Sequence, residues 1–301
     1  MMKKKKRDNI FGVLFAMSPL VGFALFGVLP LIFSIVLSFG NLPTYNLLDI
    51  EFCGLDNYIR IFTEDAEFGQ SIGNTFLYSF ITVGGTVVIS LIASLFLNKI
   101  KRGGKLIRII LFIPYVCSVV ATSTMWKWLF DYNYGVLNDI VEFFGMTRVN
   151  WLGEAATAMP IMILMSIWGG LGYNMILYSA ALNSVSRTYY EAAELDGAGS
   201  IKQFFSITLP MISPTTFFIM VMGFIGALQS FANFQVMTPS GGPDGTTWTM
   251  VFRVWYVAFV EDSYRYGMGY ASAMSWIVGG IVMIFTAIMF GLSRRWVNYD
   301  V

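Results

Sequence analysis

Residues 188–210 read TYYEAAELDGAGSIKQFFSITLP, and this stretch is the most informative part of the chain. It is a charged segment set between two long apolar stretches, 158–183 and 211–235. A helix that crosses a bilayer needs about 20 mostly apolar residues, so a charged segment is not required for crossing. We therefore expect 188–210 to lie outside the membrane, held between two membrane helices.

The composition of the whole chain indicates an integral membrane protein. The 301 residues are 56% hydrophobic and 12% charged, whereas a soluble domain has about 25% charged residues. A net charge of +1 gives no indication of nucleic-acid binding. The chain has no histidine, which argues against a metal site or a histidine base. Cys53 and Cys117 predict no disulfide framework, and Cys117, within an apolar run, is expected in the core.

The apolar runs predict an all-α membrane domain with six crossing helices. The first run follows the basic start MMKKKKRDN, yet it is far longer than the roughly 7–15 apolar residues of a signal peptide. We interpret it as an uncleaved helix. The expected helices cover about 11–39, 72–97, 107–130, 158–183, 211–235 and 269–293.

The basic residues set the expected orientation, because cytoplasmic loops carry an excess of lysine and arginine. They gather at 3–7, 99–108, 187–202 and 294–295. With six crossings these positions share one side of the membrane. Both termini and the segment 188–210 are therefore expected in the cytoplasm.

The third outer loop differs from the other two. TPSGGPDG, residues 238–245, is a turn-rich break. The following TTWTMVFRVWYVAFV, about 246–260, is too short to span and contains Arg253. We expect an aromatic-rich helix at the outer interface, with a re-entrant segment as the alternative.

The segment 188–210 has the local signals of two short helices. The spacings of Thr188–Glu191 and of Ser200–Gln203 match capping boxes. Gly197 is expected to end the first helix in the left-handed conformation, and Pro210 to end the second. A plain connector between two crossings is the alternative, but it needs less structure than this. Exposed acidic and apolar side chains on such a motif predict a protein partner in the cytoplasm.

These residues resemble the EAA motif of permease subunits of binding-protein-dependent ABC importers. The match continues over nearly the whole chain, in stretches that resemble the carbohydrate-uptake branch: 111–138, 167–185, 230–243 and 269–285. Residues 14–39 resemble the first helix of the maltose and glycerol-phosphate type of first permease subunit. The residues that match the motif, and that the resemblance assigns to ATPase coupling, are Glu191, Ala192, Ala193, Asp196, Gly197, Ala198, Phe204, Leu209 and Pro210.

The chain also departs from the family pattern. Val185-Ser186 stands where the family usually has Ile-Pro, a change not expected to affect coupling. The run 231–234 reads FANF where an Asp is frequent, which bears on the sugar that is bound. The large outer insertion of the maltose-type protein is absent, so a binding protein must dock on shorter loops.

The resemblance implies a type I ABC importer permease fold in a bacterial-type cell membrane. This chain and a homologous second permease would form the pathway together. A cytoplasmic ATPase dimer would hold ATP and magnesium and receive the EAA segment in a cleft, leaving this chain without a cofactor. An outer solute-binding protein would deliver the sugar.

The chain has no motif for chemistry of its own, so it is not expected to be an enzyme. Gly104-Lys105 is followed by Leu106 and forms no phosphate-binding loop, and no G-x-S-x-G is present. The glycine-rich 241–245 is interpreted as a turn. The apolar segments lack the paired acids of proton-coupled carriers.

Sugar contacts are expected from aromatic rings, which pack on sugar C–H faces, and from amides, which pair with hydroxyls. For each candidate, ordinary helix packing is the alternative. Asn174, Gln229 and Asn233 rank first, because an amide at membrane depth needs a polar partner or a cavity. The full set is Tyr115, Trp126, Tyr173, Asn174, Gln229, Phe231, Asn233 and Phe234.

The leading functional hypothesis is a permease for a sugar, foremost an oligosaccharide. A polyol phosphate is the alternative substrate, although the scarcity of basic residues in the crossings favours a neutral ligand. Lys127 is the exception and is expected to extend to the outer interface. Two further classes of protein compete with the importer hypothesis. One is an ion-driven carrier, which often has internal repeats and broken crossings, and the second is a membrane-embedded enzyme.

Overall fold

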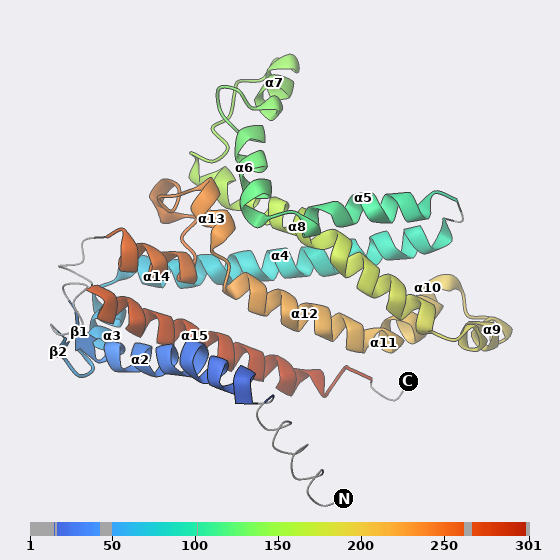
Figure 1. Ribbon diagram of the computed structural model, residues 1–301. Helices are drawn as coiled ribbons and strands as arrows, with labels where there is room; N and C mark the ends of the chain where they lie inside the picture. Colours follow the sequence, from blue (N-terminus) through green and yellow to red (C-terminus); the bar gives the residue numbers. More distant parts are fainter. Residues whose placement is uncertain (1–14, 16, 43–49, 101, 262–266, 299–301) are drawn as a thin grey trace, which may run out of the picture. The chain divides into compact units, whose positions relative to one another are not determined.

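The computed structural model describes residues 15, 17–42, 50–100, 102–261 and 267–298, so the basic cluster 3–7 and the start of the first predicted helix lie outside it. The described residues divide into two compact units. One comprises the chain up to Asp65 together with Val254–Val278, and the other comprises Ala66–Arg253 together with Gly279 onward. Helices dominate both units (Figure 1). The predicted all-α class is confirmed, apart from one two-residue strand pair.

The first unit begins with an apolar helix, Met17–Ser38. It contains a π-helical turn, η1 (Ala24–Val28), followed by α2 (Leu29–Ser38), and the backbone N–H of Leu29 bonds to the carbonyl of Ala24. The strands β1 (Gly40–Asn41) and β2 (Glu51–Phe52) then pair antiparallel, and α3 (Asp56–Thr63) follows. Asn57 joins these elements by donating to the carbonyls of Ser38 and Gly40 at 3.1 and 3.0 Å.

The second unit is built around α8 (Ala155–Ser184), on which α4 (Ala66–Lys99), α5 (Gly104–Val116) and α12 (Ser213–Leu228) pack (Figure 1). The buried face of α4 is a stripe of small hydroxyl side chains, which lets neighbouring backbones approach closely. Large apolar side chains on the other faces of α4, such as Phe80 and Ile81, are exposed, as expected next to lipid. The stripe consists of Ser71, Thr75, Ser79, Thr82, Thr86, Ser90 and Ser94.

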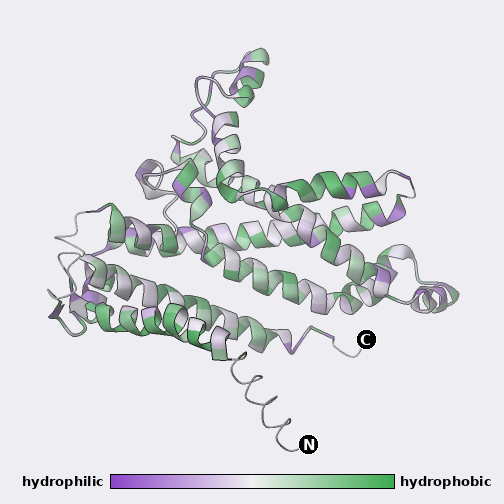
Figure 2. Ribbon diagram, viewed as in Figure 1, coloured by the Kyte–Doolittle hydropathy of each residue, from purple (hydrophilic) through white to green (hydrophobic). Residues whose placement is uncertain are grey.

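Four helices are long and apolar enough to cross a membrane, and two bent pairs bring the candidates within the described residues to at most six. The four are Met17–Ser38, Ala66–Lys99, Ala155–Ser184 and Gly267–Ser293, the last being α15. The helices expected at 72–97, 158–183 and 269–293 are therefore present and slightly longer. Figure 2 shows hydrophobic residues along these helices and hydrophilic ones at the α4–α5 turn and around α9 (Arg187–Leu195).

The helix predicted at 107–130 is present as two helices with a break between them. The chain bends by 100° between α5 and α6 (Val119–Leu129). Pro114 lies in the last turn of α5 and cannot donate a backbone hydrogen bond, and Cys117 and Ser118 then take extended conformations. Cys117 is exposed at this break, which corrects its expected place in the core.

The helix predicted at 211–235 is also interrupted. It ends at Leu228 and resumes as α13 (Ala232–Met237). A side chain replaces one of the missing helical bonds, because the Thr249 hydroxyl donates to the carbonyl of Ser230 at 2.7 Å. The Ser230 hydroxyl in turn donates to Asn233 Oδ1 at 2.9 Å. Non-helical backbone at membrane depth requires such partners.

Between α6 and α8, a short helix, α7 (Val136–Phe143), is fastened by two side chains. The fully buried Asn138 accepts from the backbone of Val149 and from the indole of Trp151, both at 3.0 Å. Arg148 pairs with Asp139 and Glu142, each at 2.9 Å. The hydrogen bond to Glu142 is the largest cause that raises the pKa of Arg148.

The glycine-rich loop at 238–245 forms the predicted turn, with left-handed backbone at Gly241, Gly242 and Gly245 and a 3-10 turn, η4 (Pro243–Gly245). The helix expected at about 246–260 is α14 (Met250–Phe259). Its first turn is not an exposed interfacial surface. Arg253 is only 2% exposed and pairs with Glu67 at 2.9 Å. The arginine that interrupts the apolar pattern therefore has a partner on α4.

Candidate functional site

The segment 188–210 forms two short helices joined by a sharp turn. The first, α9, is capped by Ser186, whose hydroxyl accepts from the backbone of Thr188 at 3.4 Å. The predicted cap by Thr188 is therefore wrong by two residues. Ser186 occupies the position where the family pattern has proline, and a serine serves there as an N-cap.

The end of α9 is as predicted. Gly197 has φ +74°, the left-handed conformation that only glycine adopts without strain. The N–H of Gly197 bonds to the carbonyl of Glu194 at 3.0 Å, and the N–H of Ala198 bonds to the carbonyl of Ala193 at 2.9 Å. This pair of bonds is a Schellman motif, which fixes the direction of the chain after Gly197.

The second helix begins at Ser200 and continues through Pro210. It consists of α10 (Ser200–Gln203), a π-helical turn η3 (Phe204–Thr208) and α11 (Leu209–Met211). The expected capping box is wrong, because the Gln203 amide donates to the Ala198 carbonyl at 3.0 Å instead. Pro210 does not end the helix either. The wide turn before it moves the preceding carbonyls away from the proline ring, and the chain bends by 63° only after Met211.

The base of the segment is joined firmly to the long helices. The hydroxyls of Tyr190 and Thr208 lie 2.9 Å apart and connect α9 to η3. The side chains of Tyr190, Ile207 and Met211 pack against a buried cluster formed by Tyr178, Val185, Ile212 and Ile219. A force on the tip of the segment would therefore reach α8 and α12 directly.

The tip of the segment exposes both charge and apolar surface. The acids Glu191, Glu194 and Asp196 are exposed. Leu195 is 91% exposed and Ile201 78%. Large aliphatic side chains so far from the core, next to acids, are typical of a surface that another protein covers.

A second feature of this unit is a cavity of about 680 Å³ at the two helix breaks. It is bordered by the α5–α6 break, by the middle of α8 and by the loop between α12 and α13. Tyr115, Gln229, Phe231 and Asn233 of the eight predicted pathway residues line it. The remaining lining residues are Pro114, Cys117, Val119, Thr122, Met165, Ser166, Trp168, Gly169, Gly170, Gly226, Ser230 and Ala232.

A polar network holds the wall of this cavity. Tyr78 donates to the Ser166 hydroxyl at 2.8 Å. The Asn233 amide also points to Ser166, at 3.5 Å, and its Oδ1 accepts from Ser230. Three helices thus meet through side-chain hydrogen bonds at the point where α12 is broken.

An aromatic pair provides a flat surface at the α5 part of the lining. Tyr115 is half exposed, and its ring stacks on that of Tyr173 with 4.5 Å between centroids and a 10° interplanar angle. Tyr173 thus supports the wall from behind. Trp126 is buried against Phe130 and Trp168, and Phe234 is fully buried with its ring edge-on to Tyr78. Trp126 and Phe234 therefore lie in packed protein, outside the lining.

A smaller cavity of about 220 Å³ adjoins the first and shares Ser166, Gly170 and Gly226 with it. Asn174 lines this second space, and its amide donates to the Gly170 carbonyl at 2.9 Å. Thr82 and Thr86 of the hydroxyl stripe face it as well. The two cavities adjoin along α8 and α12, and the smaller one also borders α4.

Ser166, Ser230 and the α4 hydroxyls were not among the predicted site residues. Serine and threonine are common in membrane helices, because they can bond to their own backbone. The usable signal was the spacing of the α4 hydroxyls: seven small hydroxyl residues recur every three or four positions from Ser71 to Ser94. That period identifies one helix face.

These features agree with a family model described as a binding-protein-dependent transport system inner membrane component, which matches residues 85–298. This chain belongs to that family. It is a multi-pass membrane permease of the carbohydrate-uptake type of ABC importer.

Several relatives cover most of the permease. The probable ABC transporter permease protein YesP of Bacillus subtilis is 33% identical over 99% of this chain and 96% of YesP. The diacetylchitobiose uptake system permease protein NgcF of Streptomyces coelicolor is 32% identical over 85% of this chain and 73% of NgcF. The sn-glycerol-3-phosphate transport system permease protein UgpA of Yersinia pestis is 30% identical over 84% of each chain.

The fold has a solved counterpart. A chain of a bacterial ABC transporter involved in the import of the acidic polysaccharide alginate superposes with a TM-score of 0.82, covering 98% of the permease and 99% of that chain at 22% identity. At this identity the likeness supports the fold alone. Broken crossings also occur in ion-driven carriers, so family membership, and not the breaks, distinguishes the permease from that class.

Proposed function

We propose that this permease forms one half of the pathway of an ATP-driven importer for a neutral oligosaccharide, together with a homologous second permease. The observation that supports this most is the shared scaffold of its two sites. The cavity is lined by α8 and α12, and the same two helices hold the buried cluster on which the segment 188–210 rests.

Movement of the segment would therefore change the cavity. A cytoplasmic ATPase dimer, which holds ATP and magnesium, would receive the acidic and aliphatic tip at Glu191 and Leu195. Closure of the ATPase would push on α9, and Tyr190, Ile207 and Met211 would transmit the push to α8 and α12. In the proposed orientation both termini and the segment lie in the cytoplasm, which the distribution of basic residues favours.

The cavity chemistry supports a sugar. Tyr115 offers a flat ring for the C–H face of a pyranose, while Gln229, Asn233 and Ser230 offer donors and acceptors for hydroxyls. Among the lining residues that the structure describes, none carries a formal charge. A phosphate or carboxylate would lack a cationic partner from these residues, so we favour a neutral sugar over a polyol phosphate.

A binding protein outside the membrane would deliver the sugar. On the proposed outer side, the turn at 238–245 and the helix α7 present ordered surfaces to which the binding protein would dock. Gln70 and Asn74 of α4 hold the turn in place by donating to the carbonyls of Asp244 and Gly245 at 2.8 and 2.9 Å.

The experiment is an uptake assay in cells that carry the whole transporter. We expect Glu191→Lys, and separately Gly197→Pro, to abolish uptake, because one reverses the charge of the tip and the other cannot adopt φ +74°. Both sites are exposed, so both variants should fold and reach the membrane. Glu191→Lys should keep the wild-type unfolding temperature, whereas Gly197→Pro should lower it slightly, because proline removes the N–H that bonds to the Glu194 carbonyl. Glu51→Lys, an equal charge change on β2, is the control and should transport normally. Normal uptake by either test variant would show that the segment is not the coupling element.

A further inference from the structure

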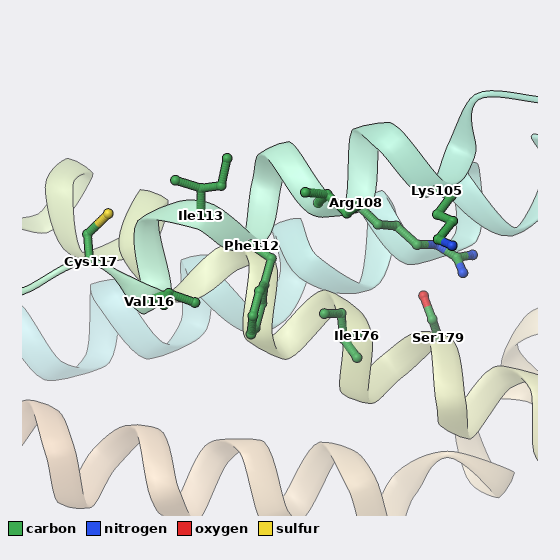
Figure 3. Close-up of a pocket in the computed structure, with 9 residues that line it drawn as sticks. Lys105, Arg108, Phe112, Ile113, Val116, Cys117, Ile176 and Ser179 are labelled. Atoms are coloured by element: carbon green, nitrogen blue, oxygen red, sulfur yellow. The ribbon is translucent and has the colours of Figure 1, made fainter.

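A third concave surface adjoins the larger cavity at Cys117 and otherwise has its own lining. It is a groove of about 540 Å³ along one face of α5, closed on one side by α8 (Figure 3). Its α5 residues follow the spacing of a single helix face. The lining residues are Lys105, Arg108, Ile109, Phe112, Ile113, Val116, Cys117, Ile176 and Ser179.

The groove is polar at one end and apolar along the rest. Lys105 and Arg108 lie at the polar end together with the Ser179 hydroxyl, and Cys117 marks the opposite end (Figure 3). From Lys105 to Cys117 the helix rises by about 18 Å. One leaflet contributes about 15 Å of hydrocarbon, half of a core of about 30 Å. The groove therefore has the length of one leaflet.

The polar end has unused hydrogen-bonding capacity. Arg108 donates through Nη2 to Asn98 Oδ1 at 2.7 Å, but its Nε is buried without a hydrogen-bond partner among the described residues. The hydroxyl of Ser179 is likewise buried and has no partner within the described part of the chain. Buried polar atoms without partners cost free energy, and a small movement of the Arg108 side chain would open its Nε to an acceptor from a ligand.

We propose that this groove binds an anionic phospholipid of the inner leaflet. The phosphate headgroup would pair with Lys105 and Arg108 through charge-assisted hydrogen bonds, and one acyl chain would lie along Ile109, Phe112 and Ile113. Much of the surface of α5 is apolar and would contact acyl chains of any lipid, whatever the headgroup. The two cations at one end are what distinguish this groove from the rest of the helix surface and select for negative charge. The choice of leaflet rests on the proposed orientation of the permease, while headgroup selection is independent of transport.

The test measures lipid retention by the full chain. The permease is placed in nanodiscs with equal amounts of phosphatidylglycerol and phosphatidylcholine, released into mild detergent, and analysed by native mass spectrometry. We expect about one phosphatidylglycerol per chain in the wild type. The double variant K105Q/R108Q should retain at least fivefold less, down to the level of phosphatidylcholine.

The control is K99Q/R102Q, which removes the same charge from the end of α4 and the neighbouring α4–α5 turn, at positions outside the groove lining. It should retain phosphatidylglycerol like the wild type. Ile176→Trp, which fills the groove without changing charge, should lose the lipid. Equal retention by all variants, or equal loss in the control, would overturn the proposal. Loss of the lipid from wild-type chain whenever the second permease co-purifies would assign the groove to a protein interface and also overturn it.

Discussion

Gly172 illustrates how one residue sets the distance between two membrane helices. A Cβ at this position would overlap the carbonyl oxygen of Leu111 on α5. The backbones of α8 and α5 therefore approach as closely as glycine allows. Both the cavity and the proposed lipid groove depend on this contact, because α5 contributes to each of them.

We predict that Gly172→Ala destabilises the permease by about 1–3 kcal/mol, the usual cost of overpacking a tight contact. Gly169→Ala is the matched control on the same helix, since nothing lies within 4 Å of its added Cβ. Alanine is the better helix former by about 1 kcal/mol, so the control should be neutral or slightly stabilised. Thermal unfolding in detergent measures both. Equal midpoints for the two variants would contradict the close contact.

At the residue scale, the residue types that line the cavity were more predictable than the location of each side chain. The amides Gln229 and Asn233 could be selected because an amide at membrane depth must face a cavity or a partner, and both line the cavity. Trp126 and Phe234 could not be excluded, since a buried ring and a cavity-lining ring look alike in sequence. The cap at Ser186 was missed because Thr188 and Glu191 offered a more familiar pattern two residues later.

At the scale of the element, two π-helical turns share one arrangement. η1 ends at Val28, two residues before Pro30, and η3 ends at Thr208, two residues before Pro210. In a regular α-helix each proline ring would meet the carbonyl four residues earlier. A turn that is one residue wider avoids this contact and keeps the helix continuous.

This arrangement predicts different effects for two equivalent substitutions. Pro210→Ala restores an N–H that can bond to the Ser206 carbonyl, so the wide turn can revert to an α-helix. That change rotates the preceding residues by about 100° around the helix, which would misplace the tip of the segment 188–210. We expect uptake to fall at least fivefold with no loss of thermal stability. Pro30→Ala should leave uptake within twofold of the wild type, and a comparable loss in that control would contradict a specific role for η3.

Long apolar elements were predictable and their interruptions were not. The helices at 72–97, 158–183 and 269–293 follow from hydropathy, because roughly 20 apolar residues are enough to identify a crossing. The break at Cys117 lies inside a candidate crossing, and the break at Gln229 lies at the end of one. The break at Gln229 is supported by Thr249, whose hydroxyl bonds to the Ser230 carbonyl 19 residues earlier, and a local pattern carries no record of such a partner. The break at Cys117 follows Pro114, but membrane helices tolerate proline, so this residue alone does not predict a break.

At the scale of the whole molecule, transport requires the cavity to be open at one stage and enclosed at another. Cys117 is a suitable probe of this proposed change, because its thiol is exposed, lines the cavity and lies at a helix break. The other cysteine of this chain is Cys53, so a Cys53→Ser background leaves Cys117 as the single thiol of the permease. An accessible thiolate reacts with maleimide, whereas a covered one does not.

We predict that saturating transported sugar slows maleimide labelling of Cys117 at least threefold in the assembled transporter, since ligand in the cavity would cover the thiol. A sugar that is not transported should leave the rate unchanged. The permease alone should label rapidly under both conditions, because half of the proposed pathway is missing. If lipid in the α5 groove shielded the thiol instead, labelling would respond to phosphatidylglycerol and not to sugar. An unchanged rate in the assembled transporter, with sugar uptake demonstrated in the same preparation, would place the substrate elsewhere and remove Tyr115, Gln229 and Asn233 from the pathway.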